Sequence, residues 1–256
     1  MTENTIFRRL ADTGLFGEAK QTPDGLVGFE RTPLLLSRAE ETYAMAGRAT
    51  WLDQPAGWYA TTGSDIPALF AWLPKLLAPR FCLASSDDQC WQCRRPTRVF
   101  AICLPTDYLF LGIDVDSEDD DEEDDTPASG ETDFADVPLI GWHAGESGTF
   151  IGNLGRTNSG VRRFLEAHCP NYRPDTSKTL RGHYYMNHCD HCGAKLGDYF
   201  LHQRPRGAFF PTTEDEAMRI TLQQSHELLI AQGEYFFRDP DYIPYSHVLP
   251  VGDPAG

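Results

Sequence analysis

The chain has 256 residues, of which 41% are hydrophobic, with 15 Phe, 10 Tyr and 5 Trp, so most of it is expected to fold around a large core. No stretch approaches the roughly 18 apolar residues that span a bilayer, and the opening MTENTIFRRLADTG lacks the apolar core of a signal peptide. We therefore expect a cytoplasmic protein with no membrane partner. Its seven cysteines are then metal ligands or buried side chains rather than disulfides.

The formal net charge of −16 comes almost entirely from one segment. Residues 114–136 contain 13 acidic residues and no basic residue, whereas residues 1–113 and 137–256 carry net charges of only −1 and −2. Like charges at this density do not pack, so we expect an acidic disordered loop over 114–136. It is either a tolerated surface insertion or a docking surface for a basic partner. Its repulsion of nucleic acid would be local.

The part of the chain before the acidic loop contains both helix and strand signals. ETYAMAG and DIPALFAWLPKLLAPRF are predicted to be helical, the second as two short pieces because Pro74 and Pro79 interrupt it. Ser64 or Asp65 is the expected N-cap of this second segment. ATWLDQPAGWYAT is typical of a hairpin. The strand-like runs TRVFAICL and DYLFLGIDV are predicted to pair with each other across the intervening PTD.

The pattern after the acidic loop is again mixed. SGVRRFLEAHC predicts a short helix that ends before Pro170, and GHYYMNHC, GDYFLHQ and MRITLQQ are interpreted as strands. HELLIAQGEYFF fits either a helix or a strand, and the glycine-rich GTFIGNLGRTNSG is expected to be a mobile connector. Strands and helices do not alternate regularly and no repeat is present. The sequence therefore predicts an α+β fold of mixed short strands and helices.

Two cysteine pairs carry the clearest chemical signal. Cys90 and Cys93 in CWQC, and Cys189 and Cys192 in CDHC, each have two residues between them. One turn with this spacing presents two thiolates to the same point, and two such turns complete the four-sulfur tetrahedron that Zn²⁺ prefers. We therefore predict one structural Zn²⁺ ion, held by Cys90, Cys93, Cys189 and Cys192.

The predicted zinc site is split along the chain. Ninety-five residues separate Cys93 from Cys189, against roughly 15–20 in the commonest four-cysteine pattern. Strand-like segments flank both pairs, as a split zinc ribbon requires, and each doubling of a loop's length costs only about 0.6 kcal/mol. Residues 81–113 and 183–210 are therefore predicted to form a discontinuous zinc-ribbon-like subdomain.

Three further regions surround this subdomain and the acidic loop. We expect an N-terminal α+β region over 1–80, an insertion with a short helix over 137–182, and a C-terminal α+β segment over 211–256. Nothing in the first or the last of these regions indicates a chemical role.

Other ligand sets and other chemistries stay open from the residues alone. His188 and His191 lie beside the second pair and could replace a cysteine, and four cysteines also fit an iron–sulfur cluster. The two pairs could instead be separate redox dithiols, although no neighbouring sequence looks like a thioredoxin-type active site. Cys82, Cys103 and Cys169 are interpreted as buried hydrophobic side chains.

The sequence favours a structural metal over a catalytic one. Four thiolates leave no open coordination position and make the metal a poor Lewis acid. The deaminase pattern needs an H-x-E or C-x-E tripeptide, which precedes neither pair. GESG lacks the frame of a nucleophile elbow and is interpreted as a turn. His143 and His183 are interpreted as ordinary, partly buried histidines. We assign no catalytic residue.

The segments CWQCRRPTRVFAI and YYMNHCDHCGAKLGDYFLH resemble the paired knuckles of uncharacterised bacterial zinc-ribbon proteins, in which C-W-x-C and C-x-H-C-G recur with flanking strands. The resemblance is limited to these knuckle regions. It implies that the four cysteines are metal ligands, and it implies no activity.

These observations favour a non-catalytic, zinc-stabilised interaction protein. Its acidic loop would bind a protein partner of basic character, as an inhibitor or immunity-type partner of a basic nucleic-acid-acting protein would. The first alternative is a zinc-ribbon protein that binds nucleic acid, because arginines follow both pairs: Arg94, Arg95, Arg98, Arg204 and Arg206. This alternative is weaker because the flanking segments are not net basic. A further alternative is an enzyme of unknown class with a structural zinc. The sequence sets no oligomeric state.

Overall fold

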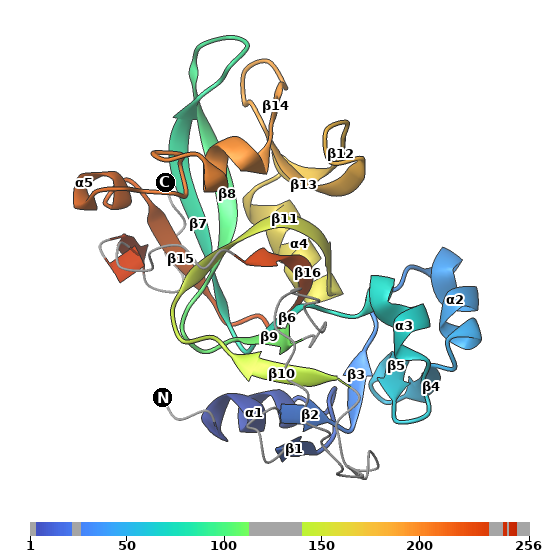
Figure 1. Cartoon of the computed structure of the whole chain (residues 1–256). Helices are drawn as coiled ribbons and strands as arrows, with labels where there is room; N and C mark the ends of the chain where they lie inside the picture. Colours follow the sequence, from blue (N-terminus) through green and yellow to red (C-terminus); the bar gives the residue numbers. More distant parts are fainter. Residues whose placement is uncertain (1–3, 22–26, 113–139, 236–242, 245, 250–256) are drawn as a thin grey trace, which may run out of the picture.

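The fold is mixed α+β, as predicted, and is built around one large sheet (Figure 1). The computed structural model describes residues 4–21, 27–112, 140–235, 243–244 and 246–249. The acidic loop expected over 114–136 lies outside these residues. In the described part of the chain, no helix is long and apolar enough to cross a membrane.

The large sheet has eleven described strands in the order β1-β2-β10-β9-β6-β16-β11-β8-β7-β15-β17. Their bounds are β1 (Ala19–Gln21), β2 (Val27–Phe29), β6 (Leu76–Ala78), β7 (Phe81–Gln89), β8 (Pro96–Leu104), β9 (Leu109–Gly112), β10 (Gly141–Ala144), β11 (Thr149–Thr157), β15 (Thr221–Ser225), β16 (Leu229–Tyr235) and β17 (His247–Leu249). Neighbouring strands are antiparallel except β15 and β17, which are parallel. Four of the five regions expected from the sequence contribute strands to this sheet, and the boundaries between those regions stay predictions.

Two smaller sheets and several short helices flank the large sheet. One small sheet has the order β3-β5-β4, and the other has the order β12-β13-β14. Their strands are β3 (Arg31–Pro33), β4 (Thr50–Asp53), β5 (Ala56–Thr61), β12 (Tyr172–Ser177), β13 (Gly182–His188) and β14 (Lys195–Leu196). The helical elements are α1 (Asn4–Ala11), η1 (Arg38–Glu40), α2 (Glu41–Ala46), α3 (Ile66–Leu69), η2 (Phe70–Trp72), α4 (Ser159–His168), η4 (Tyr199–Gln203) and α5 (Glu214–Ala217).

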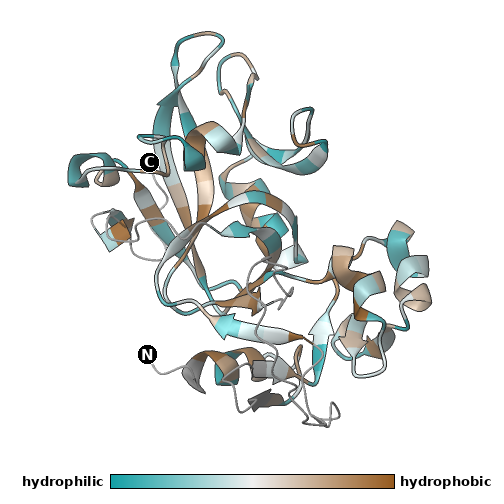
Figure 2. Cartoon of the chain, viewed as in Figure 1, coloured by the Kyte–Doolittle hydropathy of each residue, from teal (hydrophilic) through white to brown (hydrophobic). Residues whose placement is uncertain are grey.

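Apolar side chains of the large sheet form the core, and Figure 2 shows the hydrophobic residues on its central strands. The strand β8 shows how the core relates to the cysteine pairs. Burial alternates in its first half, where Thr97 and Val99 are buried and Arg98 between them is exposed. Residues Ala101–Leu104, in contrast, are all buried. Burial on one face at one end and on both faces at the other means that the β7–β8 hairpin extends out of the core. Cys90 and Cys93 lie at its projecting end.

An ion pair fastens the β3-β5-β4 region to the large sheet. Arg156, in β11, donates to both carboxylate oxygens of Glu40 at 2.6 and 2.7 Å, and to the carbonyl of Leu35 at 3.1 Å. Glu40 also accepts from the indole of Trp72 at 3.1 Å. The Arg156 guanidinium holds the pKa of Glu40 well below its usual range, although burial opposes the shift. The bidentate geometry fixes the position of η1 against β11.

Most sequence-based elements are confirmed. Helices occur in ETYAMAG (α2) and SGVRRFLEAHC (α4), and ATWLDQPAGWYAT forms the β4–β5 hairpin. Asp65 is the N-cap of α3, where its carboxylate accepts from the Ala68 N–H at 3.2 Å. The strands predicted in TRVFAICL, GHYYMNHC and MRITLQQ are β8, β13 and β15, and the ambiguous segment HELLIAQGEYFF contains the strand β16.

The predicted pairing of TRVFAICL with DYLFLGIDV is wrong. The strand β8 pairs with β7 and β11, and β9 pairs with β6 and β10. The turn after Cys90 returns the chain directly onto β7 over eight register pairs, which occupies one edge of β8, and the later strand β11 takes the other edge. The polar second half of FCLASSDDQ hid β7 from the sequence analysis.

Three further expectations are wrong. Residues 199–203 form a π-helical turn rather than a strand, because the buried Asp198 ends the extended chain and accepts a hydrogen bond from β11. GTFIGNLGRTNSG is not a connector, since Thr149–Thr157 is the strand β11. The second half of the expected helical segment 65–81 contains β6, which follows Pro74. The helix α1 was missed, although Ile6, Phe7 and Leu10 are buried on one face of it.

Candidate metal centre

The structure brings the four predicted cysteines together. Their Sγ atoms all lie within 4.8 Å of one another, with 3.6 Å between Cys90 and Cys192 and 3.7 Å between Cys93 and Cys189. A tetrahedral site with metal–sulfur bonds of about 2.3 Å places its sulfurs about 3.8 Å apart. The spacing therefore fits a single metal ion between four sulfurs, and it is far longer than a disulfide bond of about 2.05 Å.

Both pairs lie in turns with the same hydrogen bonds. The carbonyl of Cys90 accepts from the N–H of Arg94 at 2.9 Å, and the carbonyl of Cys189 accepts from the N–H of Gly193 at 2.9 Å. The residue after the second cysteine of each pair is left-handed, with φ of 62° at Arg94 and 71° at Gly193. Glycine adopts this conformation freely, whereas arginine does so at a cost. The first turn is therefore a knuckle without the glycine that marks the second one.

The pKa values of Cys189 and Cys192 are shifted in opposite directions. Burial raises the pKa of Cys189, but the N–H groups of His191 and Cys192 and the adjacent thiols lower it to about 6. The N–H of Ala194 lowers the pKa of Cys192, whereas burial and the sulfurs around it, that of Cys90 first, raise it to about 12. One thiolate thus opposes ionisation of the next. A bound divalent cation removes this conflict, because it stabilises all four as thiolates.

Neither neighbouring histidine takes the place of a cysteine. The Nε2 atom of His191 lies 2.9 Å from the carbonyl oxygen of Pro96. His188 is buried, with Nε2 at 2.9 Å from the carboxylate of Asp175 and Nδ1 at 3.0 Å from the carbonyl of Met186. Both imidazoles are therefore engaged with protein groups outside the sulfur cluster.

The other three cysteines lie outside the cluster. Cys103 and Cys169 are buried, as expected, and burial raises the pKa of Cys169 to about 12. Cys82 is only partly buried, and it lies opposite Cys103 in the β7–β8 pairing. Burial also raises the pKa values of both Cys82 and Cys103, so these thiols are poor metal ligands.

A buried asparagine joins the two halves of the site. Asn187, in β13, is 1% exposed and pairs with the main chain of Phe100 in β8. Its Oδ1 accepts from the Phe100 N–H at 2.7 Å, and its Nδ2 donates to the Phe100 carbonyl at 2.9 Å. The side-chain amide therefore makes the same two hydrogen bonds to Phe100 that the main chain of a neighbouring strand would make. These two hydrogen bonds fix the position of β13 along β8.

Two further contacts hold the turns themselves together. Asp190, between the second pair of cysteines, accepts from Thr97 Oγ1 at 3.1 Å and from the Arg98 N–H at 3.0 Å. The indole N–H of Trp91, between the first pair, donates to the carbonyl of Lys195 at 2.9 Å. Each cysteine turn is thus hydrogen-bonded to a strand that adjoins the other cysteine turn. These contacts were not predicted, because nothing local in the sequence identifies the partners of Asp190 and Trp91.

The sulfur cluster is buried on one side and accessible on the other. Cys90 and Cys189 are buried in the apolar cluster that contains Val99 and Leu196, whereas Cys192 is exposed. Four sulfurs at this spacing leave no ligand position for water or a substrate. The geometry suits a structural metal rather than a catalytic one.

Replacing Asn187 with alanine tests the amide contact. Asn187→Ala leaves the N–H and carbonyl of Phe100 without their partner, so we expect a loss of about 2–3 kcal/mol in the free energy of unfolding. Metal content should not change, because all four sulfurs remain. Urea unfolding with metal analysis measures both quantities. Asn171→Ala is the matched control. It removes one partly exposed hydrogen bond to Asp190 and should cost under about 1 kcal/mol. Equal losses in the two variants would contradict the role of Asn187.

A comparison of the chain with known protein families, with curated proteins and with solved structures finds no match. The resemblance of the knuckle regions to zinc-ribbon proteins stays a prediction, and the function has to be inferred from the site itself.

Proposed function

We propose that the four cysteines hold one structural Zn²⁺ ion, and that residues 81–113 and 183–210 form a split zinc-ribbon-like subdomain around it. Support comes from the tetrahedral spacing of the sulfurs and from two hairpin turns with the same hydrogen bonds. A cluster of several irons would separate the sulfurs further than one ion does, so zinc is favoured. When bound, the ion supplies a cross-link between two distant parts of the chain and a share of the folding free energy.

Metal analysis tests the zinc site. Protein purified without added metal should contain about one zinc ion per chain by mass spectrometry. The double variant Cys90→Ser, Cys189→Ser should lose the zinc and unfold at a lower temperature, because two hydroxyls cannot replace two thiolates. Cys82→Ser is the matched control and should keep both the zinc and the melting temperature. Metal-free protein after fresh reduction, or bound iron in place of zinc, would refute the assignment.

We further propose that the protein is a non-catalytic interaction protein whose acidic segment binds a partner of basic character. A basic nucleic-acid-acting protein fits, because a run of carboxylates competes for a surface built for phosphates. The main support for this proposal is the place in the fold at which the segment 114–136, with its 13 acidic residues, is inserted. The strand β9 ends at Gly112, β10 begins at Gly141, and these two glycines are register partners. The acidic segment therefore joins two neighbouring strands of the sheet.

The histidines singled out in the sequence support a non-catalytic role. The ring of His143 stacks on Phe110 with 5.3 Å between centroids, and His183 Nδ1 lies 3.2 Å from Thr176 Oγ1. In the described part of the chain, neither has the carboxylate partner that an acid–base pair requires.

Excision of the acidic segment tests the interaction proposal. Replacing 114–136 with a short Gly-Ser linker should leave thermal unfolding unchanged, because the flanking strands are already paired at Gly112 and Gly141. Calorimetric binding to a basic ribonuclease should be measurable for the full chain, should weaken with salt, and should be lost in the variant. A second variant, with the acidic residues of the segment changed to Asn and Gln, separates charge from length. Binding with the same salt dependence in all three proteins would exclude the acidic segment.

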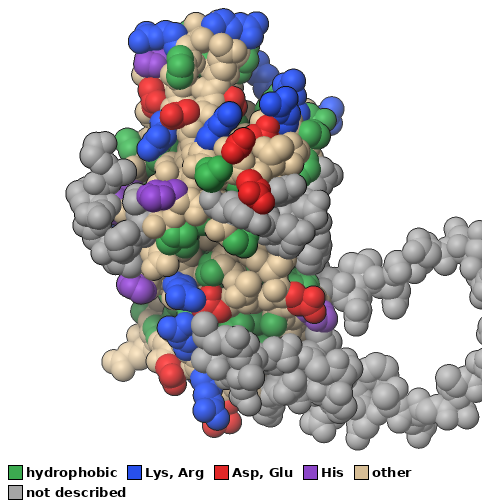
Figure 3. Space-filling model, turned by 90° about the vertical axis from the view of Figure 1, so that its left-hand side faces the viewer, with side chains coloured by type: hydrophobic (Ala, Val, Ile, Leu, Met, Phe, Trp, Pro, Cys, Tyr) green, Lys and Arg blue, Asp and Glu red, His purple; other side chains and the backbone are tan. Residues whose placement is uncertain are grey.

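Binding of nucleic acid is a second candidate, supported by the surface beside the cysteines. Figure 3 shows Lys and Arg side chains gathered at the end of the molecule where the β7–β8 and β13–β14 turns lie. Arg94, Arg95 and Arg204 form no ion pair with the described residues, and Trp91 is 61% exposed. Cations beside an exposed aromatic ring are the groups that bind single-stranded nucleic acid. However, Arg98 pairs with Asp87 and Arg206 pairs with Glu216, so fewer arginines are available than the sequence suggests.

A gel shift separates the two candidates. The second candidate predicts that the protein retards single-stranded DNA at low salt, and that Arg94→Gln with Arg95→Gln reduces the effect because two phosphate partners are lost. Lys178→Gln with Arg181→Gln, on the neighbouring β12–β13 turn, serves as the charge-matched control. Unchanged DNA mobility at micromolar protein would reject binding of nucleic acid and leave the interaction proposal.

A further inference from the structure

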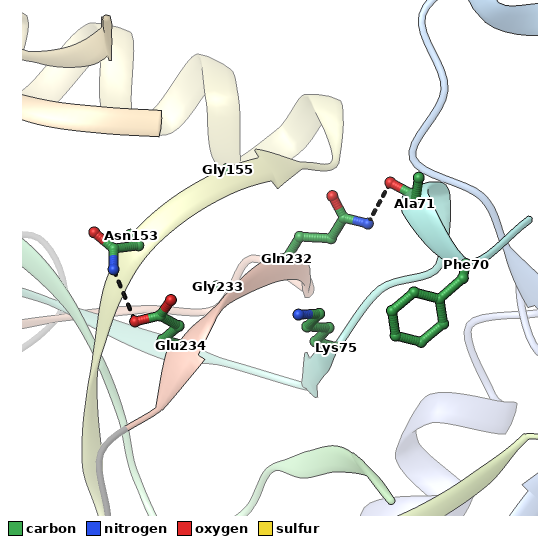
Figure 4. A pocket seen from close by; sticks show the side chains of 8 residues that line it. All are labelled: Phe70, Ala71, Lys75, Asn153, Gly155, Gln232, Gly233 and Glu234. Atoms are coloured by element: carbon green, nitrogen blue, oxygen red, sulfur yellow. Dashed lines mark hydrogen bonds between the residues drawn. The ribbon is translucent and has the colours of Figure 1, made fainter. Parts of the chain in front are cut away.

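A cavity of about 280 Å³ opens where β11 departs from regular pairing with β16 (Figure 4). Gly152 lies opposite Glu234, but the next paired residue of β11 is Arg156, opposite Gln232. Three residues of β11 therefore correspond to one residue of β16, and the strand bulges away from its neighbour. The bulge and the segment before β6 enclose the cavity on opposite sides.

A buried carboxyl group holds this bulge in an unfavourable conformation. Asn153 has a φ of 48°, which is costly for a residue other than glycine. Its N–H donates to Asp198 at 2.7 Å, and its side-chain amide donates to Glu234 at 2.7 Å. Asp198 is 1% exposed, and its second carboxylate oxygen has no hydrogen-bond partner among the described residues. Backbone strain held by a buried acid is typical of binding sites rather than of plain sheet.

The cavity wall carries polar groups that the described residues do not satisfy. The side chain of Lys75 forms no ion pair or hydrogen bond with the described residues, and its Nζ lies 5.9 Å from the centroid of the Phe70 ring. Glu234 uses one carboxylate oxygen for Asn153 and has the other free. The side-chain nitrogen of Gln232 donates to two main-chain carbonyls at 2.7 and 2.8 Å, which leaves its amide oxygen without a partner. Figure 4 shows these side chains around the cavity.

The two charged groups are complementary to one kind of ligand. Lys75 and Glu234 line the same small cavity, yet their charged atoms do not come within the 4.0 Å of an ion pair. An ammonium and a carboxylate held apart in this way match a molecule that carries a carboxylate and an ammonium of its own. The volume lies just below the range of about 300–1,000 Å³ for drug-sized ligands, which favours a compact molecule.

We propose that this cavity binds a free α-amino acid. The ligand carboxylate pairs with Lys75, its ammonium group pairs with the free oxygen of Glu234 and with the Gln232 amide oxygen, and the Phe70 ring covers its side chain. The bulge at Asn153 positions Glu234 before the ligand arrives, which reduces the ordering cost of binding. This site is independent of the metal centre and of the acidic segment.

Calorimetric titration of the full chain with each standard amino acid tests the ligand class. At least one should bind with a dissociation constant between micromolar and millimolar. The matching carboxylic acid without the amine, and the matching amine without the carboxylate, should each bind about tenfold more weakly, because each leaves one charged wall group unpaired. Failure of every amino acid to bind would overturn the proposal, as would truncated analogues that bind as tightly as the amino acid itself.

Two conservative variants test the assigned groups. Lys75→Met keeps the length of the side chain without its charge, and Glu234→Gln keeps an acceptor for Asn153. Both side chains are exposed, so the melting temperature should be unchanged. Each variant should weaken binding of the amino acid about tenfold. Lys178→Met, an exposed lysine on the β12–β13 turn, should bind as the original protein does. Full affinity in both cavity variants would place the ligand elsewhere and refute the site.

Discussion

The projecting end of the molecule depends on one constraint: two turns separated by 95 residues must meet at a single point. A metal ion enforces this meeting only if the sulfurs already lie close together, because two thiolates alone form half a tetrahedron. The amide of Asn187 and the carboxylate of Asp190 provide that approach by fixing β13 and its turn along β8. Hydrogen bonds and metal thus act at the same contact. A metal ion bound there would additionally stabilise neighbouring sulfurs as thiolates, which the hydrogen bonds do not.

The strand β8 connects this constraint to the rest of the fold. Its inner half is buried on both faces in the large sheet, and its outer half carries the contacts to Asn187 and Asp190. One continuous strand therefore connects the cysteine turns to the core. The neighbouring strand β11, which pairs with β8, connects two other features to the sheet. It holds the bulge at Asn153 and, through Arg156, the ion pair to Glu40.

Local features of the sequence predicted local features of the structure. The two-residue cysteine spacing located all four sulfurs, because each turn is determined by its own few residues. The Asn187 contact was not predictable, since its partner lies 87 residues away and an asparagine in a strand has no fixed meaning. The bulge at Asn153 was hidden for a related reason. The glycines of GTFIGNLGRTNSG suggested a connector, but two of them, Gly152 and Gly155, are part of a central strand. Strand pairing failed where a polar run concealed β7.

The split of the cysteine pairs along the chain also orders events during synthesis. A ribosome releases Cys90 and Cys93 long before Cys189 and Cys192, which lie about three quarters of the way along the chain. Between the two pairs, every acidic residue of 114–136 is translated. Through much of translation the nascent hairpin therefore carries only the thiols of its own cysteine pair, without the two other sulfurs of the proposed site. A metal ion bound by the four sulfurs would be enclosed only after Cys192 has been translated, and the first two thiols would be open to oxidation until then.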